Sequence, residues 1–381
     1  MRVVQVSFYR DPLGRPPEVL LREWPALTDV AAAVAAAGAD VHVVQAASST
    51  TEITRDRVAF HFVRERSGRW AVGRHWLTVP SRQLIGQLVA LAPDVLHVHG
   101  LSFPIALAMA ARAVRCPVLV QDHADGVPRS GRRWLSAAAL RRSAGVAFTA
   151  HAQAEPWRAA GCLPPSIPVF EVPESSSHFT PGDRDVARRA GGIVGSPAVA
   201  WVGRLQPVKD PLTAVAAFAE AVPSLPDAHL WCCFTEAPLL EAVERLVRDD
   251  PRLPGRVHLL GRLSHPEVET LLRACDVYLA ASRREGSGFA LLEALACGLP
   301  AVVTDIPSFR RLSGEGTVAS LAPPGDVSAM ARALVEWHAR PRQGERERVR
   351  AFFDEGLSFR AVGTGLMSAY ERICGDRCAP P

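Results

Sequence analysis

The segment REGSGFALLEALACG (284–298) combines charge, glycine and an apolar run in a pattern that suits ligand binding. Glu285 precedes Gly286 and Gly288, and Glu293 follows eight residues after Glu285. Glycines let the backbone approach a ligand, and the start of the following helix offers free N–H groups to a phosphate. Carboxylates accept hydrogen bonds from hydroxyls. The alternative is an acidic residue that only favours the helix dipole, although a buried Glu293 would still need a partner.

A second segment, WVGRLQPVKDP (201–211), places two cations on a loop between a strand and a helix. Arg204 and Lys209 lie five residues apart, after a strand that ends at Gly203 and before a helix that starts near Pro211. Arginine offers a planar fork of donors and lysine a point charge, and the pair suits a diphosphate. Ordinary surface cations on a solvated loop are the alternative interpretation.

These two motifs must be brought together by the strands and helices around them. The sequence predicts two runs of alternating strands and helices. The first run has strands at 2–8, 40–45, 94–100, 116–123, 143–150 and 168–173, with helices at 22–38 and 103–114. The second has strands at 198–203, 229–235, 256–261, 276–282 and 300–305, with helices at 211–221, 238–248, 265–274 and 289–297.

Such alternation predicts an α/β protein of two doubly wound parallel sheets facing a cleft, with ligands at the carboxyl ends of strands. The polar segment 173–185 reads as the connection, and 358–374 as a further helix. We expect domains at 1–175 and 176–357, with 358–381 crossing back to the first.

Composition narrows the class of protein. The 381 residues carry 43 Lys and Arg against 39 Asp and Glu, a net charge of +4 that is too mild for a dedicated nucleic-acid binder. Apolar stretches are too short to span a bilayer, and the N-terminus lacks a signal peptide's apolar core. The eight cysteines form no CxxC pair, which favours a reducing compartment. We therefore expect a cytoplasmic protein.

Together, VGRLQPVKDP and EGSGFALLEALACGLPAVVTD resemble the C-terminal domain of GT-B-fold retaining glycosyltransferases of family 4. The resemblance is strong after residue 196 and weaker before it. It implies two Rossmann-like domains, an N-terminal one on the acceptor side and a C-terminal one for a nucleotide-diphosphate sugar. A UDP-sugar is favoured over a GDP-sugar by family frequency. The resemblance also implies same-face attack, no metal and no cofactor.

The same resemblance implies roles for individual residues. Arg204 and Lys209 would bind the donor diphosphate, Glu285 a hydroxyl of the donor sugar, and Glu293 the ribose. His123, at a strand end, would lie near the reacting sugar, with His97 and His99 as rivals and a plain surface histidine as the alternative. The main chain would contribute in two places: at the base through Gly261, Arg262 and Leu263, and at the sugar and phosphate through Gly286, Ser287, Gly288, Phe289 and Ala290.

Two departures bear on these roles. The first loop, YRDPLGRPPE (9–18), has one glycine, Gly14, where the family carries a Gly-Gly pair, and Arg10 or Arg15 is the candidate substitute. The linker VPESSSHF (172–179) lacks the usual Asn-Gly step. The acceptor stays unidentified: a sugar, a small molecule or a lipid-linked group. The rival functions are a nucleotide-sugar epimerase of the same fold and a catalytically inactive nucleotide-sugar-binding homologue.

Three further patterns carry weaker hypotheses. Asp183-Arg184-Asp185 matches a metal-binding Asp-x-Asp pattern, but we expect solvated linker there. The segment 131–142 could be a basic amphipathic helix on anionic lipid, or an exposed helix whose Trp134 and Leu135 face the core. Cys232 and Cys233 lie in a predicted buried strand, where we expect core packing.

Overall fold

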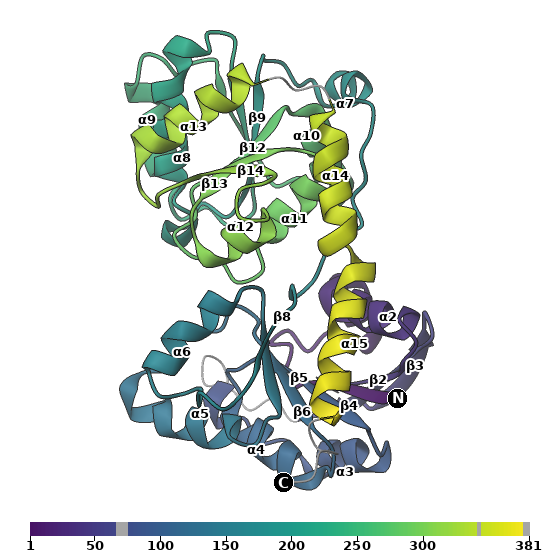
Figure 1. Cartoon of the computed structure of the whole chain (residues 1–381). Helices are drawn as coiled ribbons and strands as arrows, with labels where there is room; N and C mark the ends of the chain where they lie inside the picture. Colours follow the sequence, from purple (N-terminus) through teal and green to yellow (C-terminus); the bar gives the residue numbers. More distant parts are fainter. Residues whose placement is uncertain (66–74, 341–343, 376–381) are drawn as a thin grey trace. The chain divides into compact units, whose positions relative to one another are not determined.

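The computed structural model describes residues 1–65, 75–340 and 344–375, with side chains left undescribed at 25–27. Contacts within the chain divide it into two compact units. The N-terminal unit comprises Met1–Ser176 with Phe359–Pro381, and the C-terminal unit comprises Ser177–Ser358. Each unit is a largely parallel sheet with helices on both faces, which confirms the predicted α/β class (Figure 1).

The N-terminal unit is built on an eight-stranded sheet of order β3-β4-β2-β1-β5-β6-β7-β8. All neighbours are parallel except β3 and β4. Its strands are β1 (Arg2–Ser7), β2 (Asp40–Ala47), β3 (Thr51–Arg55), β4 (Val58–Arg64), β5 (Val95–His99), β6 (Val118–Gln121), β7 (Gly145–Phe148) and β8 (Val169–Glu171). The strand order reverses between β1 and β5, which makes their carboxyl ends the ligand-binding position expected of such sheets.

Two groups of helices cover this sheet. One apolar cluster packs α3 (Arg82–Ala90), α4 (Pro104–Ala113), α5 (Arg133–Leu140) and α6 (Glu155–Ala159). The other packs α1 (Pro17–Glu23), α2 (Pro25–Ala36) and the C-terminal α15 (Phe359–Gly375). Short 3-10 turns are η2 (His75–Leu77), η3 (Ser130–Arg132) and η4 (His151–Ala154).

The last helix is fastened to the N-terminal unit by close packing and by a buried hydrogen bond. A Cβ on Gly363 would come within 2.3 Å of the Ala33 carbonyl oxygen, so α15 can approach α2 this closely only with glycine there. The buried Tyr370 hydroxyl lies 2.7 Å from His97 Nδ1 on β5.

The C-terminal unit has a six-stranded parallel sheet of order β11-β10-β9-β12-β13-β14. Its strands are β9 (Ala198–Gly203), β10 (His229–Phe234), β11 (Val257–Gly261), β12 (Val277–Ala280), β13 (Ala301–Thr304) and β14 (Ala319–Ala322). Its helices are α7 (Arg184–Gly191), α8 (Pro211–Ala221), α9 (Leu240–Asp249), α10 (His265–Ala274), α11 (Phe289–Ala296), α12 (Pro307–Leu312), α13 (Val327–Ala339) and α14 (Glu345–Gly356), with the 3-10 turns η5 (Pro207–Lys209) and η6 (Val222–Ser224).

Strand β9 shows how the sequence serves both faces of this sheet. Ala198 and Ala200 belong to the apolar cluster formed with α10, α11 and α14, while Val199 and Trp201 belong to the cluster with α8, α9 and α13. Side chains alternate between faces along a strand, so a strand covered on both sides is apolar throughout.

Three expectations about elements were wrong or incomplete. The single helix expected at 22–38 is two, because Pro25 cannot lie inside a helix and instead begins α2. The antiparallel β3 was not predicted, since Thr51–Arg55 lacks an apolar run and lies half-exposed at the sheet edge. Trp134 does not face the core: α5 leaves it 68% exposed and buries Ala137 and Leu140 instead.

The expectation for the two cysteines is confirmed. Cys232 and Cys233 are buried in β10, and burial raises the pKa of both thiols, to about 12 for Cys232. The solvated linker expected at 183–185 was wrong, because Asp183 caps α7 by accepting from the Val186 N–H at 2.8 Å and Asp185 lies in the first turn of that helix.

Candidate functional site

The C-terminal unit brings two of the predicted motifs together at the carboxyl ends of β9 and β12. These strands are neighbours at the point where the strand order reverses. The Arg283 N–H donates to the Val208 carbonyl at 2.9 Å, and its guanidinium lies 2.8 Å from Asp210. Asp210 also caps α8 through the Thr213 N–H at 3.3 Å. The loop after β9 is thereby tied to the loop after β12.

Lys209 and Glu285 form the centre of this site. Lys209 Nζ lies 2.6 and 2.7 Å from the two carboxylate oxygens of Glu285, and the Ser282 hydroxyl donates to one of them at 2.7 Å. The side chains are 20% and 11% exposed. This mostly buried ion pair thus joins the residue predicted to bind the diphosphate, Lys209, to the residue predicted to bind the sugar, Glu285.

Arg204 is not brought into the same cluster. Its side chain is 48% exposed and lies 3.7 Å from Glu236, which also accepts a hydrogen bond from Gln206. Arg204 follows β9 directly, on the loop that carries Lys209, and its role stays a prediction.

The glycine loop adopts the backbone conformation that the motif requires. Gly288 has φ +62° at the N-cap of α11, and a Cβ there would lie 2.8 Å from Leu312 and 3.3 Å from Phe309. Ser287 is buried, whereas Phe289 is 41% exposed. The N–H groups of Phe289 and Ala290 begin α11, where a helix supplies no internal acceptors for its first donors.

Glu293 projects from the first turns of α11 and is paired with a histidine. Its carboxylate lies 3.0 Å from His265 Nε2, and this hydrogen bond is the main cause of the raised pKa of His265. Burial, and then the charges of Glu285 and Glu293, raise the pKa of Tyr278 well above its usual value. Both predicted carboxylates thus act on one buried tyrosine of β12.

The predicted base-contacting loop follows β11. Gly261 has φ +67° with open space where a Cβ would stand, and Arg262 is exposed. Burial raises the pKa of the nearby Cys233 thiol, and the Leu263 backbone acts in the opposite direction.

His123 lies in the N-terminal unit, directly after β6, inside a polar cluster. Its Nδ1 is 2.9 Å from Glu174 and its Nε2 is 2.8 Å from His99 Nδ1. Burial would lower the pKa of His123, but Glu174, Asp125 and Asp122 raise it. Burial, and secondly Asp125, raise the pKa of Asp122 to about 7. The predicted rivals His97 and His99 are both buried in β5.

A cavity of about 160 Å³ opens at the same end of this sheet. The Asp125 carboxylate connects the cavity to His123, because it accepts from the Leu101 N–H at 2.6 Å, the Ser102 hydroxyl and the His123 N–H at 3.4 Å. The cavity is lined by three aromatic rings, one arginine and two hydroxyls among other groups: His75, Trp76, Leu101, Ser102, Pro104, Gly126, Pro128, Arg132, Ser136 and Trp157.

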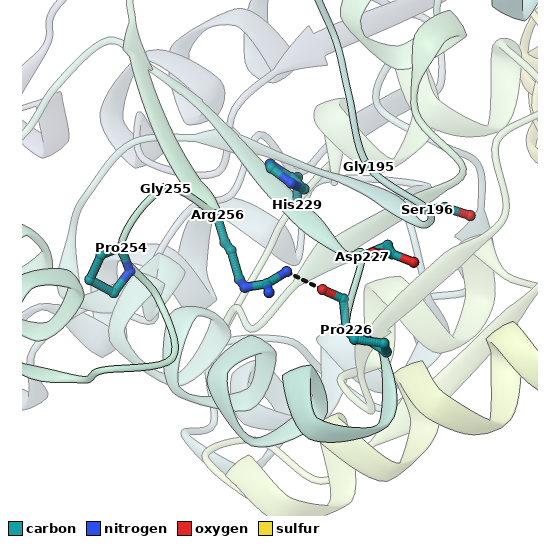
Figure 2. A pocket seen from close by; sticks show the side chains of 8 residues that line it. All are labelled: Gly195, Ser196, Pro226, Asp227, His229, Pro254, Gly255 and Arg256. Carbon is teal, nitrogen blue, oxygen red and sulfur yellow. Dashed lines mark hydrogen bonds between the residues drawn. The ribbon is translucent and has the colours of Figure 1, made fainter.

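A larger, open pocket of about 680 Å³ lies at the other end of the C-terminal sheet. Figure 2 shows its lining, in which Arg256 donates to the Pro226 carbonyl. Its residues precede β9, β10 and β11 or, like His229, begin the strand, so the pocket lies at the amino ends of the strands. It contains none of the predicted site residues, and ligands of doubly wound sheets bind at the opposite ends.

In the first loop both candidate substitutes for the missing glycines are engaged within the protein. Arg10 lies 2.9 Å from Glu65, and Arg15 lies 2.8 Å from Asp11 and also contacts Glu23. Their proposed contact with the donor phosphates therefore stays a prediction.

Sequence reasoning missed four residues of these clusters: Asp210, Arg283, Asp125 and Glu174. Asp210 and Arg283 lie beside recognised motif residues, so their charge was a usable signal. Glu174 stands in the linker and meets His123 only through the fold, so no local pattern marks it.

Comparison with known proteins identifies the family. Residues 196–340 match the family model described as glycosyl transferases group 1, and residues 26–169 match that of glycosyltransferase family 4. The chain belongs to the family 4 glycosyltransferases of GT-B fold. The expected family and architecture are thus confirmed, whereas the retaining mechanism stays a prediction.

Similar proteins include D-inositol 3-phosphate glycosyltransferase of Mycobacterium tuberculosis, 30% identical over 223 residues that make up 57% of this chain and 46% of the relative. The chain thus spans about half the length of that relative. Two solved structures share the fold over nearly all of both chains. Sucrose-phosphate synthase from Thermosynechococcus elongatus has TM-score 0.68 and 18% identity, covering 99% of this chain and 100% of that one. Anabaena HepE, in complex with UDP and glucose, has TM-score 0.66 and 17% identity, covering 97% of this chain and 99% of that one.

This glycosyltransferase chain has, within residues 1–65, 75–340 and 344–375, no helix that is both long and apolar enough to cross a membrane.

Proposed function

We propose that the protein is a retaining glycosyltransferase that moves a sugar from a UDP-sugar to an acceptor. The Lys209–Glu285 pair at the carboxyl ends of β9 and β12 carries this proposal, because it sets a cation and a carboxylate side by side in front of the glycine-rich start of α11. The UDP assignment is supported by Anabaena HepE, a similar structure that was solved with UDP and glucose.

In the proposed complex the donor replaces the internal ion pair with two better matched contacts. The diphosphate takes Lys209 Nζ and the first N–H groups of α11, and a sugar hydroxyl donates to Glu285. Negative charge grows on the diphosphate as the sugar bond breaks, so these donors stabilise the transition state more than the ground state. We propose same-face attack, with the departing phosphate oxygen accepting the acceptor's proton and with no metal.

We propose that Glu293 holds the ribose and that the main chain at Gly261, Arg262 and Leu263 contacts the base. In the free protein the Glu293 carboxylate lies 3.0 Å from His265 Nε2. The ribose hydroxyls would replace His265 as the hydrogen-bond partners of this carboxylate. Arg204 would reach the diphosphate from the exposed position that it shares with Glu236.

For the acceptor, we propose the cavity beside His123. The Arg132 guanidinium stacks 4.2 Å from the centre of the Trp76 ring, and the Trp76 indole nitrogen is buried with no hydrogen-bond partner in the described part of the chain. An aromatic face, an unpaired donor and a cation suit a ring that carries an anionic group. Two similar proteins are named for sugar-phosphate chemistry, which supports a phosphate-bearing acceptor.

The test combines donor binding with transfer. Thermal shift against UDP-, GDP- and ADP-sugars should show stabilisation by one UDP-sugar, because a ligand that binds only the native state raises the melting temperature. Transfer to sugar phosphates should fall about 100-fold or more in Glu285→Gln. The exposed Glu241→Gln removes a carboxylate that pairs with Arg245 four residues along the same helix; it is the matched control and should keep full activity.

Three results would refute the proposal. Full transfer activity in Glu285→Gln would show that Glu285 is not part of the donor site. An isomerised sugar formed from the donor alone would favour the epimerase. Binding of a UDP-sugar without turnover across the acceptor panel would favour the inactive homologue.

A further inference from the structure

Glu174 is a buried carboxylate that has no place in the donor chemistry described above. It follows β8 in the stretch where the linker departs from the family pattern, and it is 8% exposed. Its Oε1 lies 2.9 Å from Nδ1 of His123. A buried carboxylate beside an imidazole holds one tautomer and favours the protonated ring.

The contact belongs to a chain of three hydrogen bonds. Glu174 meets His123 Nδ1, His123 Nε2 meets His99 Nδ1 at 2.8 Å, and His99 Nε2 meets the Gln5 amide oxygen at 3.2 Å. The chain begins at a carboxylate and ends at an amide oxygen, and both groups only accept. Each of the three links needs its own proton, so two imidazoles share three protons. With the Gln5 amide oxygen facing His99, one of the two rings is therefore an imidazolium.

The surroundings decide which ring carries the charge. His99 is buried in β5, and burial, followed by its neighbours His97 and His123, lowers the pKa of His99 well below its ordinary value. His123 faces three acidic groups: Glu174 after β8, and Asp122 and Asp125 beside it after β6. Their charges outweigh burial and raise the pKa of His123. Three acidic neighbours around His123 and, in the described part of the chain, none on the buried side of His99 therefore favour His123 as the ring that carries the extra proton.

We propose that Glu174 is a positioning residue that holds His123 as a doubly protonated cation, so that His123 supplies fixed positive charge beside the proposed acceptor cavity and does not act as a base. This inference rests on the proposed function, in which the acceptor occupies the cavity beside His123. With both ring nitrogens carrying protons, His123 cannot take the proton of the acceptor. That proton goes to the departing phosphate oxygen, as same-face attack requires.

The charge state can be measured without substrate. In the uniformly ¹⁵N-labelled full-length protein, long-range ¹H–¹⁵N spectra separate a doubly protonated histidine from either neutral tautomer, and His123→Gln assigns the signal. We expect both nitrogens of His123 to be protonated at pH 7. Glu174→Gln keeps a side chain of the same shape but removes its charge, and we expect the His123 titration midpoint to fall by at least one pH unit.

Controls separate charge from shape. Glu174→Asp retains the charge and should recover part of the midpoint, while Glu155→Gln, which removes an exposed carboxylate paired with Arg158, should leave it unchanged. In transfer assays the alkaline limb of the kcat/KM profile should move to lower pH in Glu174→Gln by the same amount as the midpoint.

A neutral His123 in the wild-type protein would overturn the inference, and would be the result if the Gln5 amide were reversed so that its nitrogen faced His99. An unchanged midpoint in Glu174→Gln would overturn it as well. Failure of the proposed function looks different: no UDP-sugar would be turned over, while the His123 signal would still report a cation.

Discussion

Replacing Lys209 by methionine should reveal how the free protein holds its donor site. At the observed 2.6 and 2.7 Å, the attraction between Lys209 and Glu285 amounts to roughly 6 kcal/mol at an effective dielectric constant of about 20. Taking both ions out of water costs several kcal/mol each, so the pair contributes little net stability. Lys209→Met, however, leaves the Glu285 charge mostly buried with only polar partners such as Ser282.

We therefore expect Lys209→Met to lower the free energy of unfolding by about 3 kcal/mol. The double variant Lys209→Met with Glu285→Gln removes both charges, and we expect it to lie within about 1 kcal/mol of the wild type. Urea unfolding, followed through the transition of the C-terminal unit, measures both values. Transfer activity should behave differently: it should fall about 100- to 1,000-fold in Lys209→Met and should not recover in the double variant.

Two outcomes would refute this reasoning. If Lys209→Met is as stable as the wild type, the Glu285 carboxylate is well solvated without its partner and the site is not the preorganised pair described. If the double variant is destabilised by the sum of the two single effects, the two residues do not interact.

Two further predictions follow from the glycine loop and from α5. Gly288→Ala should lower the free energy of unfolding by about 1–2 kcal/mol because of the positive φ, and by more because the new Cβ would lie 2.8 Å from Leu312; it should also weaken UDP-sugar binding in thermal shift. Gly192→Ala, with φ +65° and open space around the Cβ, measures the backbone cost alone. Equal losses of stability in the two variants would contradict the packing argument. Trp134, exposed beside the basic residues of 131–142, should support co-sedimentation with anionic liposomes that falls several-fold in Trp134→Ala and at high salt, whereas unchanged binding would remove this helix as a membrane contact.

Local sequence was sufficient for eleven of the fourteen described strands and for the two motifs at their ends, but it missed β3, β4 and β14. Strand β9 and helix α11 lie within one residue of their predicted bounds. A strand buried on both faces must be apolar throughout, and this marks β9 in the sequence. Gly288 has a positive φ that does not fit inside a right-handed helix, so α11 begins after it. The loops that carry Lys209 and Glu285 follow strand ends, and parallel strands bring such ends to one edge of a sheet. The edge strand β3 escaped prediction because a half-exposed strand has no apolar run to mark it.

What only the tertiary structure decided is which charges meet. The sequence marked Lys209 and Glu285 as separate ligands, but the order β9-β12 makes them partners, since strands 70 or more residues apart in the chain become neighbours in the sheet. The hydrogen-bond chain through His123 joins Glu174 after β8, His99 on β5 and Gln5 on β1. No spacing along the sequence predicts these contacts. The energy of such contacts depends on distance and burial, which arise only when the sheet has assembled. The sequence therefore predicts which residues could bind a donor, whereas the tertiary structure determines how those residues pair and which of them carry protons.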